Sequence, residues 1–341
     1  MRNPLLSVVG PTATGKTQFS LDLATYFKEN FHAFDIISAD SRQVFKEMEV
    51  GTGADIPLGF EKEEHNPESV SRFANPYYTK DAVRIHGVAI EKPNQDWSVA
   101  QFRDFAQKIM TTSWQENSLP IIVGGTGLYH QHIFTQDHQI EVPPNESVRA
   151  HAERISLANL QRWVKDLDEA KFEAMNNSDR HNPRRLIRVI EIHLAANDSE
   201  QAKKMPSSKH AEPEKMSDEL VQHLMIGLTD SIEHISERIS KRIKERLGQG
   251  MLDEVQKLIA NYDEVEWRGP AFTATGYKEV RSYLEDKLTY QQMQDLWLRR
   301  EVQYAKRQHT WWKKQQGIEW FDISEKGWQK KAIKLIQDWL Q

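Results

Sequence analysis

The amino-acid sequence predicts an α/β fold, in which a parallel β-sheet is flanked by helices and interrupted by an all-helical lobe. Two observations carry this prediction. Short apolar runs alternate with helical patterns between residues 5 and 123, whereas the stretch from residue 142 to residue 200 has helical patterns only. Because strands that alternate with helices are typical of parallel βαβ units, we expect the helical stretch to be an insertion in the sheet domain.

The first element is an apolar run of strand length at residues 5–9, and a helical pattern begins after a glycine loop. In such a P-loop, backbone N–H groups at a helix N-terminus surround phosphate oxygens, a lysine adds charge and a hydroxyl can hold Mg²⁺. We therefore predict a P-loop NTPase-like core that binds a pyrophosphate-bearing substrate. Alone, the loop is equally typical of ATP-binding kinases and ATPases. Its residues are Gly10, Pro11, Thr12, Ala13, Thr14, Gly15, Lys16 and Thr17.

Two further apolar runs end in polar residues. Residues 34–39 lead to Asp40 and Ser41, and residues 119–123 lead to the turn Gly124-Gly125-Thr126. Ligands of parallel sheets gather at the carboxyl ends of strands, so both ends are expected to face the P-loop. From its position, Asp40 can be a magnesium ligand, a general base or a cap for the residues that follow it.

The remaining chain completes the expected order of elements. Residues 55–95 contain four prolines and predict long loops, and Asn182-Pro183 predicts the start of a helix. Residues 198–218 are polar and predict a mobile connection. An apolar run at 221–228 predicts a strand that rejoins the sheet, and helices are expected from residue 231 to the end. The predicted divisions are 1–140 for the first part of the core, 141–218 for the helical insertion and 219–341 for the rest of the core with basic C-terminal helices.

Composition narrows the classes of function. The 341 residues include no cysteine, which excludes disulfides and thiolate zinc sites and makes Mg²⁺ the natural metal. No run approaches the roughly 18 apolar residues of a membrane span, and no signal segment precedes the first strand, so we expect a cytoplasmic protein. His130 and His132 suggest a metal pair, but residues two apart in a helix do not share a face.

Basic residues are concentrated in three segments although the net charge is −5. Each can be a solvated helix face, but together they also suit nucleic acid. In the last segment one helical stripe is apolar and predicts core, while the other combines charge with aromatic rings that could stack on bases. The segments are Arg184 to Arg188, Arg238 to Arg246 and Arg299 to Lys314; the two stripes are Leu298, Val302, Ala305 and Trp312, and Arg300, Tyr304, Arg307, Trp311 and Lys314.

The ordered series of motifs resembles the tRNA dimethylallyltransferase family, also called tRNA isopentenyltransferases, over nearly the whole chain. Each motif is weak alone, and their order makes the resemblance specific. The matching motifs are Gly10 to Thr17, Ser38 to Gln43, Gly51-Thr52, Gly124 to Tyr129, Arg185 to Arg188, Gly276 to Lys278 and Ala305 to Gln308.

The resemblance implies transfer of a dimethylallyl group from dimethylallyl diphosphate to the N6 amino group of the adenosine 3′ of the anticodon, without ATP hydrolysis. Lys16 and Thr17 would bind the leaving diphosphate with Mg²⁺, Thr17 as metal ligand, and Arg242 would assist them. Asp40 would accept the proton of the amino group. This division suits the chemistry, since the amine must lose a proton and the diphosphate gains negative charge.

The same resemblance implies a tRNA anticodon stem-loop as partner, with the target base flipped out of its stack, and we expect a monomer. The helical insertion would embrace the stem. The implied tRNA contacts are Asp40, Ser41, Arg42, Gln43, Thr126, Arg149, Arg184, Arg185, Arg188, Thr273, Gly276, Tyr277 and Lys278.

Three departures from the family pattern concern the donor pocket and tRNA affinity. Gly53-Ala54 stands where the family usually has Ala-Lys, Ile85 to Val88 replaces a His-His-Leu stretch, and Glu301-Val302 replaces a Thr-Arg pair, which removes one phosphate contact. The alternatives are an adenylate isopentenyltransferase that uses free nucleotide, a P-loop kinase or NTPase, and an inactive tRNA-binding protein. The basic helical lobe argues against the free-nucleotide enzyme. The Gly-Gly-Thr turn in place of an acidic residue argues against a kinase or NTPase, and the intact Lys16, Thr17 and Asp40 argue against an inactive protein.

Overall fold

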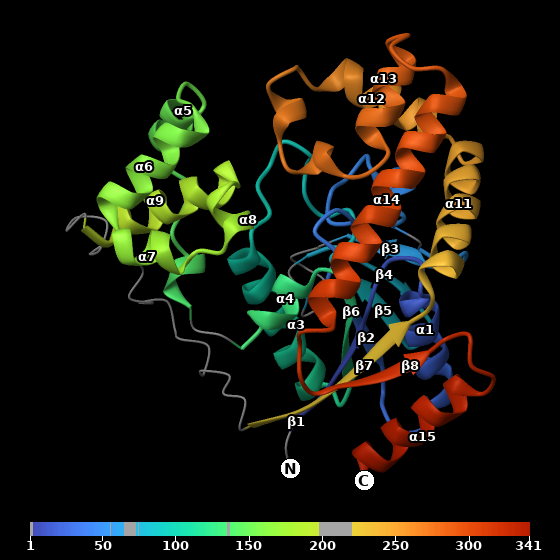
Figure 1. The fold of residues 1–341 in the computed structure, drawn as a ribbon. Coiled ribbons are helices and arrows are strands. Elements are labelled where there is room, and N and C mark those ends of the chain that lie inside the picture. The colour runs from blue at the N-terminus through green and yellow to red at the C-terminus, as the bar shows by residue number, and fades with distance from the viewer. Residues whose placement is uncertain (1–2, 55, 65–72, 74, 135–136, 198–219) are drawn as a thin grey trace. The chain divides into compact units, whose positions relative to one another are not determined.

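The computed structural model describes residues 3–54, 56–64, 73, 75–134, 137–197 and 220–341. The chain forms two compact units, one from residues 1–134 and 216–341 and the other from residues 135–215. The first contains the sheet, and the regular structure described for residues 137–197 of the second is helical (Figure 1). The expected mobile connection at 198–218 lies outside the described residues, so the predicted bounds of the insertion stay a prediction.

The core of the first unit is an eight-stranded sheet with the order β3-β4-β5-β2-β6-β1-β7-β8. The strands from β5 to β8 along this order pair in parallel. β4 pairs antiparallel with both of its neighbours, β3 and β5. The predicted α/β fold with a parallel sheet is therefore confirmed, including the strand that rejoins the sheet as β7. The strands are β1 (Asn3–Val9), β2 (Phe34–Ser38), β3 (Glu61–Glu63), β4 (Tyr77–Lys80), β5 (Val83–His86), β6 (Leu119–Gly124), β7 (Val221–Thr229) and β8 (Ile318–Asp322).

Two predictions about the elements were wrong. The region expected to be long loops contains β3, β4 and β5, and the C-terminal region expected to be helical contains β8. The strands concerned have only three to five residues, and β3 and β8 form the two edges of the sheet. Every described side chain of β3 is exposed, and none in β8 is fully buried. Such edge strands need no apolar run, so the sequence carries little signal for them.

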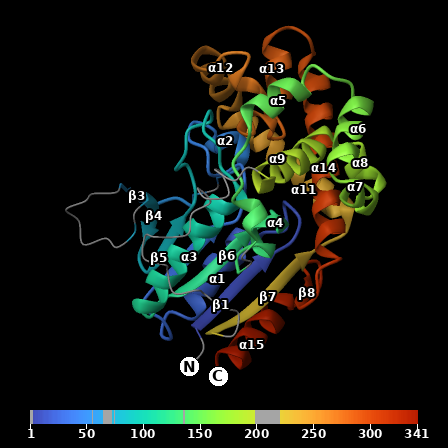
Figure 2. The same ribbon diagram turned by 90° about the vertical axis from the view of Figure 1, so that its left-hand side faces the viewer.

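Helices cover both faces of the sheet (Figure 2). On one face α1 and α15 pack on Leu6 and Val8 of β1; on the other, α3 and residues from α11 to α14 share a core with Leu5. The alternation along β1 is that of a strand buried on both sides. The helices of this unit are α1 (Lys16–Tyr26), α2 (Glu49–Thr52), α3 (Val99–Gln115), α4 (Gly127–Gln131), α11 (Ile232–Gly248), α12 (Met251–Asn261), α13 (Tyr277–Leu284), α14 (Tyr290–Trp312) and α15 (Trp328–Leu340), with 3-10 turns η3 (Glu266–Arg268) and η4 (Ala271–Thr273).

The second unit packs its helices around a small apolar core of its own that includes Leu160, Val164, Leu186 and Ile190. The last of its described helices begins at Pro183, as predicted, and the side chain of Asn182 accepts a hydrogen bond from the Arg184 N–H. None of the helices described for the chain is long and apolar enough to cross a membrane. The helices are η1 (His138–Ile140), α5 (Glu146–Ala152), α6 (Leu157–Leu167), α7 (Glu169–Ala174), α8 (Asn177–Arg180) and α9 (Pro183–Asn197).

Candidate active site

The P-loop joins the carboxyl end of β1 to the N-terminus of α1, as the sequence predicts. Gly10, Ala13 and Gly15 have positive φ angles of 135°, 63° and 77°. A Cβ on Gly10 would lie 2.2 Å from the backbone oxygen of Leu228 in β7, so only glycine fits this start of the loop. The loop thus bends tightly at the end of the central strands and presents the start of α1, a favourable place for an anion.

Lys16 folds back over this loop. Its Nζ donates a hydrogen bond of 2.6 Å to the backbone oxygen of Pro11, and the Thr14 hydroxyl donates one of 2.9 Å to the same oxygen. Burial and the neighbouring charge of Arg242 lower the pKa of Lys16 to about 7, against the opposing effect of Asp40. Arg242 and Asp40 are thus both near enough to Lys16 to influence its charge. An incoming phosphate would favour the charged form of the lysine.

Two helices far along the chain hold the P-loop. From α11, Arg238 Nε donates to the Ala13 oxygen over 2.9 Å, and Arg242 donates to Thr12 Oγ1 over 2.8 Å. From α14, Gln308 Oε1 accepts a hydrogen bond of 2.8 Å from the Thr12 N–H. The loop conformation is therefore fixed from outside as well as by its own glycines.

Asp40 follows β2 and lies beside the turn that follows β6. The Thr126 N–H donates to the Ala39 oxygen over 3.2 Å, and the Ser41 N–H donates to Thr126 Oγ1 over 3.3 Å. Asp40 Oδ1 accepts a bond of 2.8 Å from the Arg42 N–H. No helix follows Asp40, so this bond stabilises a turn and not a helix start. It orients the carboxylate and uses only one of its two oxygens.

Two tyrosines lie close enough to this carboxylate to feel its charge. Burial raises the pKa of Tyr304 on α14, and the negative charge of Asp40 adds to the effect. The pKa of Tyr129 on α4 is raised for the same two reasons, and its ring stacks on Phe102 at a centroid distance of 4.1 Å. Asp40 is therefore half-buried near two tyrosine side chains, a setting that suits a planar base with an exchangeable proton.

The remaining residues of the Asp40 loop and the predicted tRNA contacts at 273–278 form supporting contacts. Arg42 NH1 donates to the Pro270 oxygen over 2.6 Å, and Gln43 Nε2 donates to the Gly53 oxygen over 2.7 Å. Thr273 bonds the same Pro270 oxygen over 2.7 Å, and Lys278 is exposed.

The expectation that Tyr277 contacts tRNA does not fit its position, because its side chain is fully buried. Its hydroxyl donates to the Met48 oxygen and to Glu254, and its ring fills the space where a Cβ on Gly51 would lie. Gly276 is buried as well, against the ring of Trp297. Both residues therefore shape the site from within the core.

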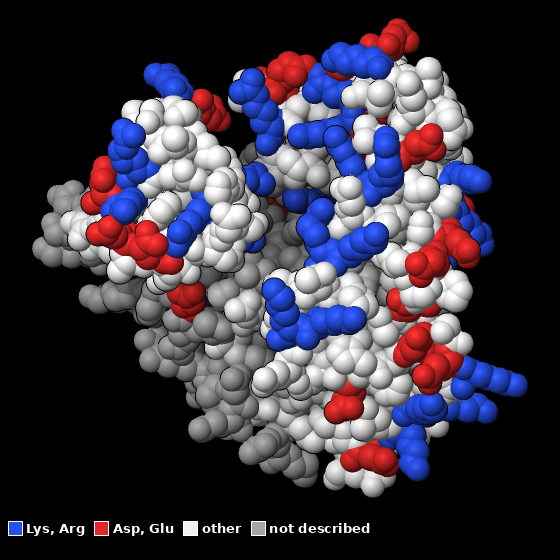
Figure 3. Space-filling model, in the orientation of Figure 1, with Lys and Arg blue, Asp and Glu red and all other residues white. Residues whose placement is uncertain are grey.

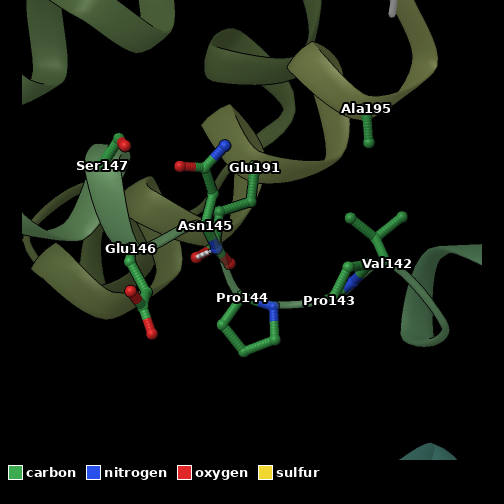
Figure 4. A pocket seen from close by; sticks show the side chains of 8 residues that line it. All are labelled: Val142, Pro143, Pro144, Asn145, Glu146, Ser147, Glu191 and Ala195. Atoms are coloured by element: carbon green, nitrogen blue, oxygen red, sulfur yellow. Dashed lines mark hydrogen bonds between the residues drawn. The ribbon is translucent and has the colours of Figure 1, made fainter. Parts of the chain in front are cut away.

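The other predicted tRNA contacts belong to the helical unit. Glu191 of α9 accepts hydrogen bonds from Arg149 and Arg188 over 2.9 and 3.2 Å, and from the Asn145 N–H over 2.9 Å. Burial alone would raise the pKa of Glu191, but these bonds outweigh it and lower the pKa. Figure 4 shows Glu191 beside Asn145 in a hollow of this unit, which contains no P-loop residue. Arg185 pairs with Asp179, and the exposed Arg184 makes no ion pair with any residue that the structure describes.

Lys and Arg side chains also gather over the face of the molecule crossed by α14 (Figure 3). The predicted apolar stripe of this helix is buried or half-buried, which confirms its core role. In the other stripe Tyr304 and Trp311 are half-buried. The exposed basic residues of the helix and its end are Arg299, Arg300, Lys306, Arg307, Lys313 and Lys314.

No group of three or more histidines and carboxylates is arranged to hold a metal within the described ranges. His130 is buried against Trp312, and burial together with His223 lowers its pKa to about 3. It is a neutral core residue. A cation at this site would rest on Thr17, half-buried in the first turn of α1, and on oxygens of the substrate.

The fold and this site define a P-loop α/β enzyme that places a carboxylate and several cations beside a phosphate-binding loop. Comparison with known proteins gives the particular family. The model of the family described as IPP transferase matches residues 74–315, and that described as isopentenyl transferase matches residues 4–65. The chain belongs to the IPP transferase family.

Curated relatives match over almost the full length. The tRNA dimethylallyltransferase of Bacillus cereus is 31% identical over 100% of this chain and 96% of its own, and that of Bacillus licheniformis is 32% identical over 94% and 91%. Among solved structures, a tRNA isopentenylpyrophosphate transferase from Bacillus halodurans is 27% identical with a TM-score of 0.64, covering 99% of this chain and 97% of its own. A eukaryotic dimethylallyltransferase acting on tRNA has a TM-score of 0.73 at 20% identity, covering 99% and 79%, which supports the fold.

Sequence reasoning missed several residues of the site. Gln308 stood in a matching motif but had no assigned role, Arg238 was one member of a basic cluster, and Glu301 counted only as a lost contact. Gln308 and Arg238 contact the P-loop from more than 200 positions away in the sequence. Glu301 contacts Arg242, which lies 59 positions away. Arg238 and Arg242 lie four residues apart and therefore on one face of a helix. This spacing was the sequence signal that the two arginines could act together.

Proposed function

We propose that this protein transfers a dimethylallyl group from dimethylallyl diphosphate to the N6 amino group of the adenosine 3′ of the anticodon in tRNA. The observation that carries the proposal is the shared site of Asp40, Lys16 and Arg242, with a carboxylate on one side of a phosphate cradle and two cations within it. A carboxylate beside tyrosine side chains suits an acceptor that is a planar base with an exchangeable proton. Family membership and the named relatives support the same reaction.

The reaction changes the charge at two atoms, the attacking nitrogen and the diphosphate oxygen that leaves the allylic carbon. The amino group attacks the allylic carbon, so one C–N bond forms as the C–O bond to diphosphate breaks, and the nitrogen loses a proton. Asp40 takes up that proton through an oxygen that does not bond the Arg42 N–H. Lys16, Arg242 and the loop N–H groups stabilise the negative charge that develops on the diphosphate.

Mg²⁺ is part of the proposal, because its preference for a few protein oxygens plus substrate phosphates fits the donors present. The Thr17 hydroxyl would hold it at the start of α1. When bound, it would neutralise charge on the diphosphate. We place the enzyme in the cytoplasm as a monomer, as the sequence argument expects.

For the RNA, we propose that the target base is flipped out of the anticodon loop and enters beside Asp40, Thr126 and Tyr304. The exposed cations of α14 and α9 would bind the backbone, because exposed Lys and Arg side chains position phosphates without reading sequence. Ser41, Arg42, Gln43, Thr273 and Lys278 lie on the loops around the site and stay proposed RNA contacts. Gly276 and Tyr277 would act by holding these loops.

The test is a transfer assay with purified protein, dimethylallyl diphosphate and an unmodified anticodon stem-loop that carries an adenosine next to the anticodon. Mass spectrometry should find one added prenyl group on the RNA and release of diphosphate. Added prenyl on AMP or ADP but not on RNA would establish the free-nucleotide alternative, with which the match at residues 4–65 is compatible. Phosphate release from ATP that depends on Lys16, without prenylation, would establish an NTPase instead.

A further inference from the structure

A buried carboxylate links the hydrophobic core to the phosphate-binding loop. Glu301 lies on α14, and only 4% of its side chain is exposed. Its Oε2 accepts a hydrogen bond of 2.7 Å from Trp297 Nε1, and its Oε1 pairs with Arg242 and, at 3.5 Å, with Arg246. Because a buried charge is costly without partners, this arrangement of one carboxylate between two arginines needs an explanation.

The partners form a continuous path to the P-loop. The same NH2 group of Arg242 that pairs with Glu301 also donates to Thr12 Oγ1 over 2.8 Å. At the other end Trp297 is fully buried, and its ring lies 2.5 Å from where a Cβ on Gly276 would be. The indole is thus wedged in the core, so it fixes Glu301, and Glu301 fixes Arg242 beside the loop.

Gly53 makes room for the second arginine. A Cβ on Gly53 would lie 2.0 Å from Arg246 NH2, and Gly53 itself has a φ of 63°. Two positions at which the sequence departs from the family pattern, Gly53 and Glu301, therefore contact the same guanidinium. The buried cluster is one unit in which each member depends on the others.

The Nε of Arg242 takes no part in the hydrogen bonds of this cluster. This nitrogen is buried and has no hydrogen-bond partner among the described residues. Arg242, Arg246 and Glu301 by themselves sum to one net positive charge. A buried, unpaired N–H with a net positive charge beside it favours an incoming anionic oxygen.

We propose that Glu301 is a positioning residue for the transfer reaction, which holds Arg242 in the orientation that meets the charge developing on the departing diphosphate. The inference rests on the proposed function, because it concerns the same loop. It differs from a simple counter-ion role. A counter-ion would affect the transfer rate only through the net charge of the cluster. A positioning residue affects the rate through the orientation of Arg242.

The test is a double-mutant cycle between Glu301→Gln and Arg242→Gln, measured as the single-turnover rate at saturating dimethylallyl diphosphate and stem-loop RNA. Glutamine keeps the acceptor for Trp297 and removes the charge. We expect Glu301→Gln to slow transfer about tenfold or more without changing the KM for the stem-loop. In the Arg242→Gln background it should slow transfer no further, because its route of action is gone. Multiplicative losses, or a wild-type rate in Glu301→Gln, would overturn the proposal.

A second variant separates position from charge and covers the case in which Glu301→Gln folds poorly. Arg246→Met with Glu301→Gln retains the single net positive charge of the native cluster. We expect transfer to stay slow, whereas recovery of the wild-type rate would show that Glu301 is only a counter-ion. Asp35→Asn is the matched control: it removes a buried carboxylate from Arg84 near the start of β2, and should cost stability without slowing the single-turnover step.

Failure of the proposed function can be distinguished from failure of the positioning role of Glu301. Wild-type protein that transfers no prenyl group would overturn the proposed function. The same cycle would then be measured on the affinity for inorganic pyrophosphate by calorimetry. Coupling between Glu301 and Arg242 in that measurement supports the positioning role, and independent effects overturn it.

Discussion

At the scale of single residues, Asp40 has the most demanding role in the proposed reaction, because its carboxylate accepts the Arg42 N–H and is proposed to accept a proton as well. Asn in its place can still accept the hydrogen bond from the Arg42 N–H but cannot act as a base. We expect Asp40→Asn to lower the single-turnover rate of transfer by about 100-fold or more while the stem-loop binds as before. Rapid-quench kinetics and filter binding measure the two quantities. Equal losses of rate and RNA affinity would contradict the role as base.

A second residue-scale prediction concerns stability in acid. Asp35 is fully buried and bonded to Arg84 and His86. Burial would raise its pKa, but the hydrogen bonds from these two partners outweigh it and hold the pKa below its usual 3.8. A folded-state pKa below the unfolded one means that the stabilisation is present above about pH 4 and is lost as the pH falls through the folded pKa.

The substitution Asp35→Asn should therefore lower stability by about 3 kcal/mol at neutral pH, with a smaller loss in acid. Thermal denaturation of both proteins between about pH 3 and pH 7 checks this. Glu116→Gln, which removes the other and more exposed partner of Arg84, is the control and should change stability less. A deficit that stays constant over this pH range would show that the charge of Asp35 is not the cause.

At the scale of elements, what the sequence can predict depends on burial. β1, β2 and β6 are almost wholly buried between two helical layers, so each leaves an apolar run, and the motifs at their ends could be placed at one edge of the sheet. β4 and β8 lack such a run because their side chains are half-buried or exposed. These strands form because they pair with a neighbouring strand, and the local sequence pattern does not predict that pairing.

The loop between β1 and α1 gives an element-scale prediction. At Gly10 a Cβ would collide with the backbone of β7 as well as strain a φ of 135°, whereas at Gly317, with a φ of 73°, a Cβ meets nothing within 4 Å. We expect Gly10→Ala to raise the KM for dimethylallyl diphosphate by about tenfold or more and to lower the melting temperature. Gly317→Ala should cost only about 1 kcal/mol of strain and leave this KM unchanged. Similar donor KM values for the two variants would show that loop geometry does not limit donor binding.

At the scale of the whole molecule, the site exists only because distant segments meet. The sequence indicates the cradle, Asp40 and Arg242 as separate candidates, partly through the resemblance. It cannot supply the contact of Gln308 with Thr12 or the path from Trp297 through Glu301, because a bond across 296 positions depends on the packing of α14 against α11. The sequence therefore indicates which motifs to consider, but the tertiary contacts of Gln308 and Glu301 come only from the fold.

The distribution of charge over the molecule gives the last prediction. A chain with a net charge of −5 can bind RNA only through local concentrations of cations. In the helical unit Arg188 and Arg149 are tied to Glu191, whereas the exposed Arg184 has no ion pair among the described residues. Arg184 is therefore the member of this cluster whose charge is least neutralised and most available to a phosphate.

We expect Arg184→Gln to raise the KM for the stem-loop several-fold and to lower the slope of log affinity against log salt by about one, with an unchanged rate at saturating RNA. Lys330→Gln makes the same change of charge on the exposed face of α15 and is the control. Because α15 packs on the sheet at residues remote in sequence from every proposed RNA contact, this variant should keep the wild-type slope. If both variants reduce the slope equally, the protein attracts RNA through its overall charge, and the helical unit has no special part in binding.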